Sequence, residues 1–275
     1  MNAPTQSPAN ADAARGPNSD KYFVEYYSTA SLSTNTLKRF ADVQRKVLAL
    51  RAAHGLGTEA LEVADVGCGA GSQAIQWAAA GHRVSAIDIS APLVEIGRQR
   101  AAKRDAAISF AVGSATALPY TDESFDVVLL PELLEHVPEW ESCLNEATRV
   151  LRRNGVLYLS TTNVLCPHQQ EFSLPLYSWY PRWLKKRCER MALTTHKEWV
   201  EHASFPAVHW FSFYQLRDFL SVRGLTCLDR FDMTANMSSG SRRMALSLVR
   251  GLPPLRFLAH VVTPYTSVFG IKDAD

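Results

Sequence analysis

The sequence of 275 residues lacks the features that mark several broad classes of protein. It has no uninterrupted run of about 18 apolar residues, so we expect no transmembrane helix. The N-terminus has no apolar core of the kind that secretory signals carry. The sequence also has no CxxC pair, and its five cysteines are widely spaced, which disfavours a structural zinc site or a disulfide framework and favours a reducing, cytoplasmic compartment.

A large excess of one charge is absent as well. The 29 Lys and Arg residues nearly balance the 27 Asp and Glu residues, so we expect no nucleic-acid partner. Residues 1–20 contain hardly a large apolar side chain, which predicts a disordered tail. The remaining residues, 21–275, have the apolar content of a folded protein and predict a single domain.

Short apolar strands and helices alternate along the first part of this domain. Apolar residues at spacings of three and four predict a helix that ends near His54. Ser90 is expected to cap a helix that runs to Lys103. Strands that are apolar almost throughout favour a parallel sheet covered on both faces, a Rossmann-like, doubly wound α/β fold. The core spans 61–165; its strands are predicted at 61–67, 83–89, 108–113, 125–130 and 156–162.

The rest of the chain departs from this rhythm. Residues 163–210 are rich in proline and aromatic side chains and predict an inserted cap over one end of the sheet. A helix is expected over 211–224, a strand over 225–231 and a last strand over 264–272. An apolar segment, 236–264, separates these last two strands.

The glycine-rich loop DVGCGAG (65–71) lies between a predicted strand and a predicted helix. Glycines permit a tight turn and let a ligand lie against bare backbone, and the helix that follows offers free N–H groups. Asp88 ends the next strand, 21 residues after Gly67, where a carboxylate can accept both hydroxyls of a ribose. A dinucleotide site would place its third small residue at Ser72, whereas the third glycine here is Gly71, which disfavours a nicotinamide cofactor.

This GxGxG loop, preceded by an acidic residue, resembles motif I of class I S-adenosylmethionine (SAM) methyltransferases. The segments ALPYTDESFDVV, LLEHVP and LRRNGVLYLSTTN resemble the UbiE/UbiG-like (methyltransferase type 11) members of that family. The resemblance covers 61–165 well and 209–232 loosely. It implies a seven-stranded, mostly parallel sheet with an antiparallel last strand, and SAM as the cofactor. The cofactor-binding residues it implies are Asp65, Gly67, Cys68, Gly69, Gly71, Asp88, Ile89, Ser114, Ala115, Leu130 and Pro131.

The resemblance also implies how these residues share the cofactor. Asp65 would lie near the methionine amino group, Asp88 would hold the ribose, and Leu130 or Pro131 would lie beside the sulfonium. Ser114 would meet the adenine at a position where the family usually has Asp. A hydroxyl accepts a hydrogen bond more weakly than a carboxylate, so we expect weaker adenine binding than is usual.

Glu132, Glu135 and His136 follow the fourth predicted strand and are the candidate catalytic residues. If Pro131 starts a helix, their spacing puts all three on one face. His136 is suited to act as a base near neutral pH, and the two carboxylates with the imidazole could instead hold a divalent metal, which is not favoured. The two glutamates could also simply favour a helix N-terminus, and His136 could be structural.

The sequence therefore predicts a SAM-dependent methyltransferase that moves a methyl group to a small-molecule hydroxyl by in-line displacement, with His136 as the base. The acceptor is expected to be phenolic or lipid-linked. Two alternatives stay open: carbon methylation of a quinone-like ring, and a SAM-binding module without catalysis. The fold class alone does not distinguish them.

Two further segments each allow a structural and a functional interpretation. The aromatic side chains of 163–210 could pack a small core of their own or line an acceptor pocket. The apolar segment 236–264 could pack around the last strand, cover the acceptor site, or lie at a membrane surface. The last of these interpretations predicts peripheral contact with the inner face of the membrane.

Overall fold

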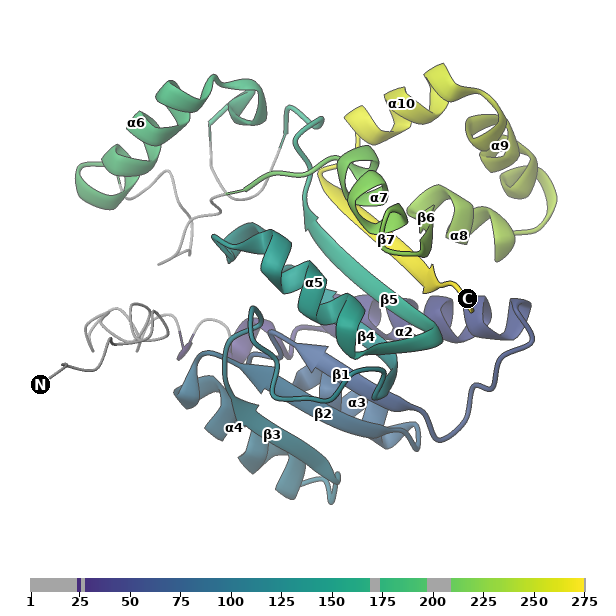
Figure 1. Cartoon of the computed structure of the whole chain (residues 1–275). Coiled ribbons are helices and arrows are strands. Elements are labelled where there is room, and N and C mark those ends of the chain that lie inside the picture. Colours follow the sequence, from purple (N-terminus) through teal and green to yellow (C-terminus); the bar gives the residue numbers. More distant parts are fainter. Residues whose placement is uncertain (1–23, 26–27, 169–173, 197–208, 275) are drawn as a thin grey trace, which may run out of the picture.

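The computed structural model describes residues 24–25, 28–168, 174–196 and 209–274, drawn in colour in Figure 1. The tail predicted over residues 1–20 lies outside them. The described residues form a seven-stranded sheet of order β3-β2-β1-β4-β5-β7-β6. The strands are β1 (Glu62–Val66), β2 (Arg83–Asp88), β3 (Ile108–Val112), β4 (Phe125–Pro131), β5 (Leu151–Thr162), β6 (Leu225–Asp229) and β7 (Tyr265–Lys272).

Strand β7 runs antiparallel to both of its neighbours, and the pairs among β1 to β5 are parallel. The predicted fold class is confirmed. In β4, Val127, Val128, Leu129 and Leu130 are each 0% exposed, because helices cover both faces of the sheet. The carboxyl ends of β1, β2 and β4 consequently meet at one edge, where the glycine loop, Asp88 and Glu132 lie.

The helices divide between the two faces of the sheet (Figure 1). One core cluster joins Val47 of α2 (Thr34–Ala53) and Trp77 of α3 (Ser72–Ala79) to the sheet. The other joins side chains of α5 (Trp140–Val150) and α7 (Phe213–Ser221) to the opposite face. The α4 helix (Ala91–Ala102) follows β2 and packs beside β3.

Two local predictions are wrong. Ser90 stands at the N-cap of α4, but its side chain makes no capping bond; its backbone N–H donates to Asp88 Oδ1 at 2.8 Å instead. The strand predicted over 225–231 ends at Asp229, where α8 (Arg230–Asn236) begins. A capping box explains that change, because the Asp229 side chain accepts from the Asp232 N–H while the Asp232 side chain accepts from the Asp229 N–H.

The predicted cap contains the 3-10 helix η4 (Tyr177–Trp179) and the helix α6 (Arg182–Thr194). Tyr177, Cys188 and Ala192 form a small core with partly buried neighbours that include Trp210. The interpretation that these aromatic side chains pack among themselves therefore holds for this part of the cap. Residues 169–173 and 197–208 of the predicted cap lie outside the described residues.

The connection between β6 and β7 is long and helical. It consists of α8, α9 (Gly240–Gly251) and α10 (Pro253–Val261), and the last two form the α9–α10 hairpin in Figure 1. The base of this hairpin is anchored by contacts to the buried Asp229 carboxylate. His260 Nε2 lies 3.0 Å from Asp229 Oδ2, and Arg256 Nε donates to the same oxygen at 2.8 Å. No described helix is both long and apolar enough to span a membrane.

Candidate functional site

The glycine loop has a left-handed backbone at its three glycines. Gly67, Gly69 and Gly71 have φ values of +75°, +51° and +73°, which residues with a Cβ rarely adopt. A Cβ at Gly71 would lie 2.9 Å from Phe110 Cζ, and one at Gly67 would lie 2.9 Å from Leu133 Cδ1. A Cβ at Gly69 would meet nothing within 4 Å. The backbone is therefore tightly packed at two glycines and borders open space at Gly69.

Asp88 connects the end of β2 to this loop. Its Oδ2 accepts a hydrogen bond from the Gly69 N–H at 2.7 Å, and its Oδ1 accepts one from the Ser90 N–H at 2.8 Å. Burial raises the pKa of Asp88, and these backbone N–H groups oppose that rise. Each oxygen keeps a further lone pair, so the carboxylate can still accept two hydroxyl groups from a ligand.

Asp65 has a fully buried carboxylate, at 0% exposure. Neither of its oxygens accepts a hydrogen bond of normal geometry from the described residues. Burial raises the pKa of Asp65 to about 7, the charge of Asp88 adds to this rise, and the Ala74 N–H opposes it slightly. A cationic group brought in by a ligand would supply the missing donor.

Two more buried polar groups near the loop also lack partners among the described residues. They are the side-chain amide of Gln73, which is 3% exposed, and the hydroxyl of Tyr120. Burial is the main cause that raises the pKa of Tyr120, to about 12. Buried polar groups are normally hydrogen-bonded, so their gathering beside open backbone indicates a site for a polar ligand. Sequence analysis missed both residues, because single polar positions inside apolar segments carry no pattern.

The other predicted cofactor residues have varied environments. Ile89 is 58% exposed beside Asp88, and Ala115 is partly buried against the core. Leu130 is 0% exposed inside the core, so its side chain is not open to a ligand, whereas Pro131 is half-buried at the strand end. Burial raises the pKa of the Cys68 thiol, which stays neutral.

Ser114 is already engaged locally. Its hydroxyl lies 2.8 Å from Thr116 Oγ1 and accepts a hydrogen bond from the Thr116 N–H at 3.2 Å. A hydroxyl has two lone pairs and one proton, so part of this capacity is used by the turn itself. The prediction of weak adenine recognition at Ser114 remains a prediction.

The prediction that Glu132, Glu135 and His136 share one helix face is wrong. Pro131 is the last residue of β4 instead of the first of a helix, and Glu132 follows it with φ +50°. A short 3-10 helix, η3 (Leu134–His136), comes next. The left-handed conformation of Glu132 turns the chain sharply before Glu135, so the spacing of a regular helix does not apply to these residues.

The two glutamates consequently lie in opposite environments. Glu132 is exposed and forms a two-pronged ion pair with Arg39 of α2. Glu135 is 2% exposed and accepts a hydrogen bond from the Thr161 hydroxyl at 2.7 Å. Burial raises the pKa of Glu135 to about 8, so this side chain is largely neutral at pH 7.

His136 lies half-buried at the end of η3. It is near the carboxyl ends of the strands, where the sequence predicted a base. Within the described ranges, no three His, Cys, Asp or Glu side chains gather in a way that could hold a metal ion.

An arginine of α4 links the glycine loop to the segment that precedes α2. Arg100 Nη2 donates to the Ser28 carbonyl at 2.8 Å, and Arg100 Nη1 donates to Ser31 Oγ at 3.1 Å and to the Ala70 carbonyl at 3.4 Å. Ser72 Oγ donates to Ser31 Oγ at 3.1 Å. The sequence did not predict these hydrogen bonds of Arg100, because Ser28 and Ser31 lie about 70 positions before it in the chain.

The comparisons with known proteins agree with this geometry. Residues 64–159 match the family model described as a methyltransferase domain. The chain is 33% identical over 166 residues to a demethylmenaquinone methyltransferase of Clavibacter sepedonicus, which covers 60% of this chain and 62% of that protein. Residues 64–159 therefore carry the sequence signature of a methyltransferase domain. The predicted resemblance is thereby confirmed.

A second relative of this methyltransferase domain is the ubiquinone biosynthesis O-methyltransferase of Bartonella tribocorum, 25% identical over 176 residues, with 64% of each chain covered. The chain therefore spans less than two thirds of either relative. A solved structure, a putative sarcosine dimethylglycine methyltransferase from Galdieria sulphuraria, superposes with a TM-score of 0.53 at 16% identity over 85% of each chain. That superposition supports the fold of the domain.

Proposed function

We propose that the whole chain is an active SAM-dependent methyltransferase with a small-molecule acceptor. The observation that carries the proposal is a group of buried polar atoms around the open backbone at Gly69 that have no hydrogen-bond partner among the described residues. The Asp65 carboxylate suits the ammonium of an amino-acid moiety, and the Gln73 amide can bind its carboxylate. The Asp88 carboxylate suits a ribose, while exposed Ile89 offers an apolar surface to an adenine ring.

SAM, when bound, supplies the sulfonium methyl group that an acceptor takes by in-line displacement. The chain's own part is to align the two ligands and to manage the acceptor's proton. We assign the proton to His136, which lies beyond the carboxyl end of β4. Glu135, buried and bound to Thr161, holds the turn that carries His136 and is a positioning residue.

The acceptor class that we propose is a hydroxyl on a phenolic or lipid-linked molecule. The printed name of the Bartonella relative, an O-methyltransferase, supports oxygen as the methylated atom. The similarity to a demethylmenaquinone methyltransferase favours a quinone-like ring as the second candidate, with methyl transfer to carbon. A non-catalytic SAM-binding module is the third.

Calorimetric titration of the full chain with S-adenosylhomocysteine, with NAD⁺ titrated in parallel, tests the cofactor. We expect micromolar binding of S-adenosylhomocysteine alone, and a loss of at least tenfold in Asp88→Ala. Asp218→Ala is the matched control, because Asp218 is exposed on α7, away from the loop. Binding of NAD⁺ alone, or unchanged affinity in Asp88→Ala, would refute the assignment. Transfer of labelled methyl from SAM to phenolic and quinone acceptors then separates an enzyme from a binding module.

A further inference from the structure

The apolar side chains of the α9–α10 hairpin have little cover from the described chain. Seven large apolar side chains between Met244 and Val262 are 43% to 77% exposed. No residue from 236 to 259 whose side chain is described is buried. By contrast, α2 buries Val43, Val47 and Leu50 against the sheet. Packing around the last strand, one of the sequence-based interpretations, therefore does not account for this segment.

The hairpin itself carries side-chain charge of one sign. From Met233 to Lys272 the sequence contains no Asp or Glu, whereas it contains four arginines and a lysine. Arg250 and Arg256 pair with Asp232 and Asp229 at the hairpin's base, and Arg243 is exposed on α9. A surface that combines exposed leucines with arginines and no acidic side chain is complementary to an anionic apolar partner.

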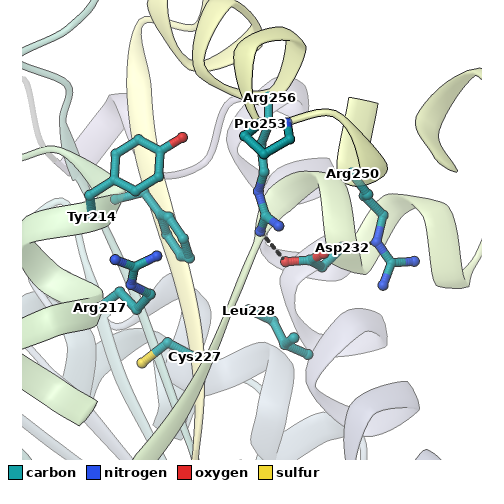
Figure 2. A pocket seen from close by; sticks show the side chains of 9 residues that line it. Tyr214, Arg217, Cys227, Leu228, Asp232, Arg250, Pro253 and Arg256 are labelled. Atoms are coloured by element: carbon teal, nitrogen blue, oxygen red, sulfur yellow. Dashed lines mark hydrogen bonds and ion pairs between the residues drawn. The ribbon is translucent and has the colours of Figure 1, made fainter. Parts of the chain in front are cut away.

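A cavity lies beneath the hairpin (Figure 2). It has a volume of about 400 Å³ between α7, β6, α8, α9 and α10, and no predicted cofactor or catalytic residue lines it. Its three arginines come from three different helices, and each is ion-paired: Arg217 with Asp218, Arg250 with Asp232, and Arg256 with Asp229 and Asp232. Phe257 stacks on Tyr214 of the lining at 6.4 Å, so apolar surface continues from the cavity to α10.

We propose that the α9–α10 hairpin docks on the surface of an anionic lipid bilayer. Its exposed leucines enter the boundary between head groups and acyl chains, and the exposed arginines of α9, Arg243 and Arg250, lie at the level of the lipid phosphates. A second copy of this chain is a poorer partner for the hairpin, because a two-fold contact would set one acid-free, positive surface against another. The proposal does not depend on methyl transfer, and its failure would leave the proposed function untouched.

Sedimentation of the full chain with vesicles tests the proposal. We expect binding to phosphatidylglycerol-containing vesicles that is at least tenfold stronger than binding to phosphatidylcholine vesicles. Leu248→Glu and Leu258→Glu, at side chains 57% and 56% exposed, should each weaken this binding about tenfold. Val222→Glu, at an 80% exposed position after α7, is the matched control and should bind as the unaltered chain does. Circular dichroism and S-adenosylhomocysteine affinity should be the same in all variants.

Three outcomes would overturn the proposal. The first is an absence of binding to anionic vesicles. The second is equal binding by Leu258→Glu and the unaltered chain. The third is a dimer, seen by light scattering, that Leu258→Glu dissociates while no form of the protein binds vesicles.

Discussion

The substitution Asp65→Asn should remove a pH-dependent loss of stability from the ligand-free protein. The pKa of Asp65 is raised from 3.8 to about 7, chiefly by burial. The folded state therefore holds this proton more tightly than the unfolded state does, so the free energy of unfolding falls as pH rises from 3.8 and levels off above about 7. A rise of about three units at about 1.36 kcal/mol each gives a loss of about 4 kcal/mol at pH 8.

Asparagine has the same shape and no titration, so the variant should gain about 4 kcal/mol relative to the unaltered chain between pH 4 and pH 8. Urea unfolding at several pH values, without ligand, measures this difference. Asp218→Asn changes a side chain that is 66% exposed, so its curve of unfolding free energy against pH should run parallel to that of the unaltered chain. Parallel curves for Asp65→Asn as well would show that Asp65 is not the buried, partnerless carboxylate described above.

The other predictions concern the catalytic turn and the glycine loop. His136→Ala should lower turnover at least a hundredfold while S-adenosylhomocysteine affinity changes little; near-normal turnover would reject His136 as the base. Glu135→Gln, which copies the neutral form of this buried carboxyl, should keep most turnover at pH 7, whereas a metal ligand or base would lose it. Gly71→Ala should lower the free energy of unfolding by about 2 kcal/mol more than Gly55→Ala does. Both glycines have φ near +70°, but only at Gly71 would the added Cβ lie within 3 Å of Phe110. Equal losses of stability in thermal melting would contradict this.

The parts of the fold that the sequence predicted are those governed by local apolar pattern. Strands β1 and β4 are buried along most of their length, so each stands out as a short apolar run, and alternation with helices predicts a parallel sheet. The glycine loop and Asp88 were predictable together because carboxyl ends of neighbouring parallel strands meet at one edge.

The parts that the sequence did not predict depend on backbone turns and long-range contacts. The spacing of Glu132 and Glu135 is typical of a helix face, but the left-handed conformation of Glu132 separates them. Gln73 and Tyr120 have no hydrogen-bond partner among the described residues because no described polar group lies within reach of them. A pattern in the sequence does not reveal such a three-dimensional arrangement. The exposure of the hairpin is likewise invisible in composition, since its leucines resemble those of any buried helix.

The contact of Arg100 with Ser28, Ser31 and Ala70 has a practical consequence for handling the protein. The Arg100 guanidinium links the segment that precedes α2 to the glycine loop, against which a cofactor would bind. A truncation that removes the chain through Ser31 takes away two of these partners. Of the described contacts, Arg100 then keeps the longer ones, to the Ala70 carbonyl at 3.4 Å and to Ser72 Oγ at 3.5 Å. A shortened protein should therefore be compared with the full chain before its cofactor affinity is taken as native.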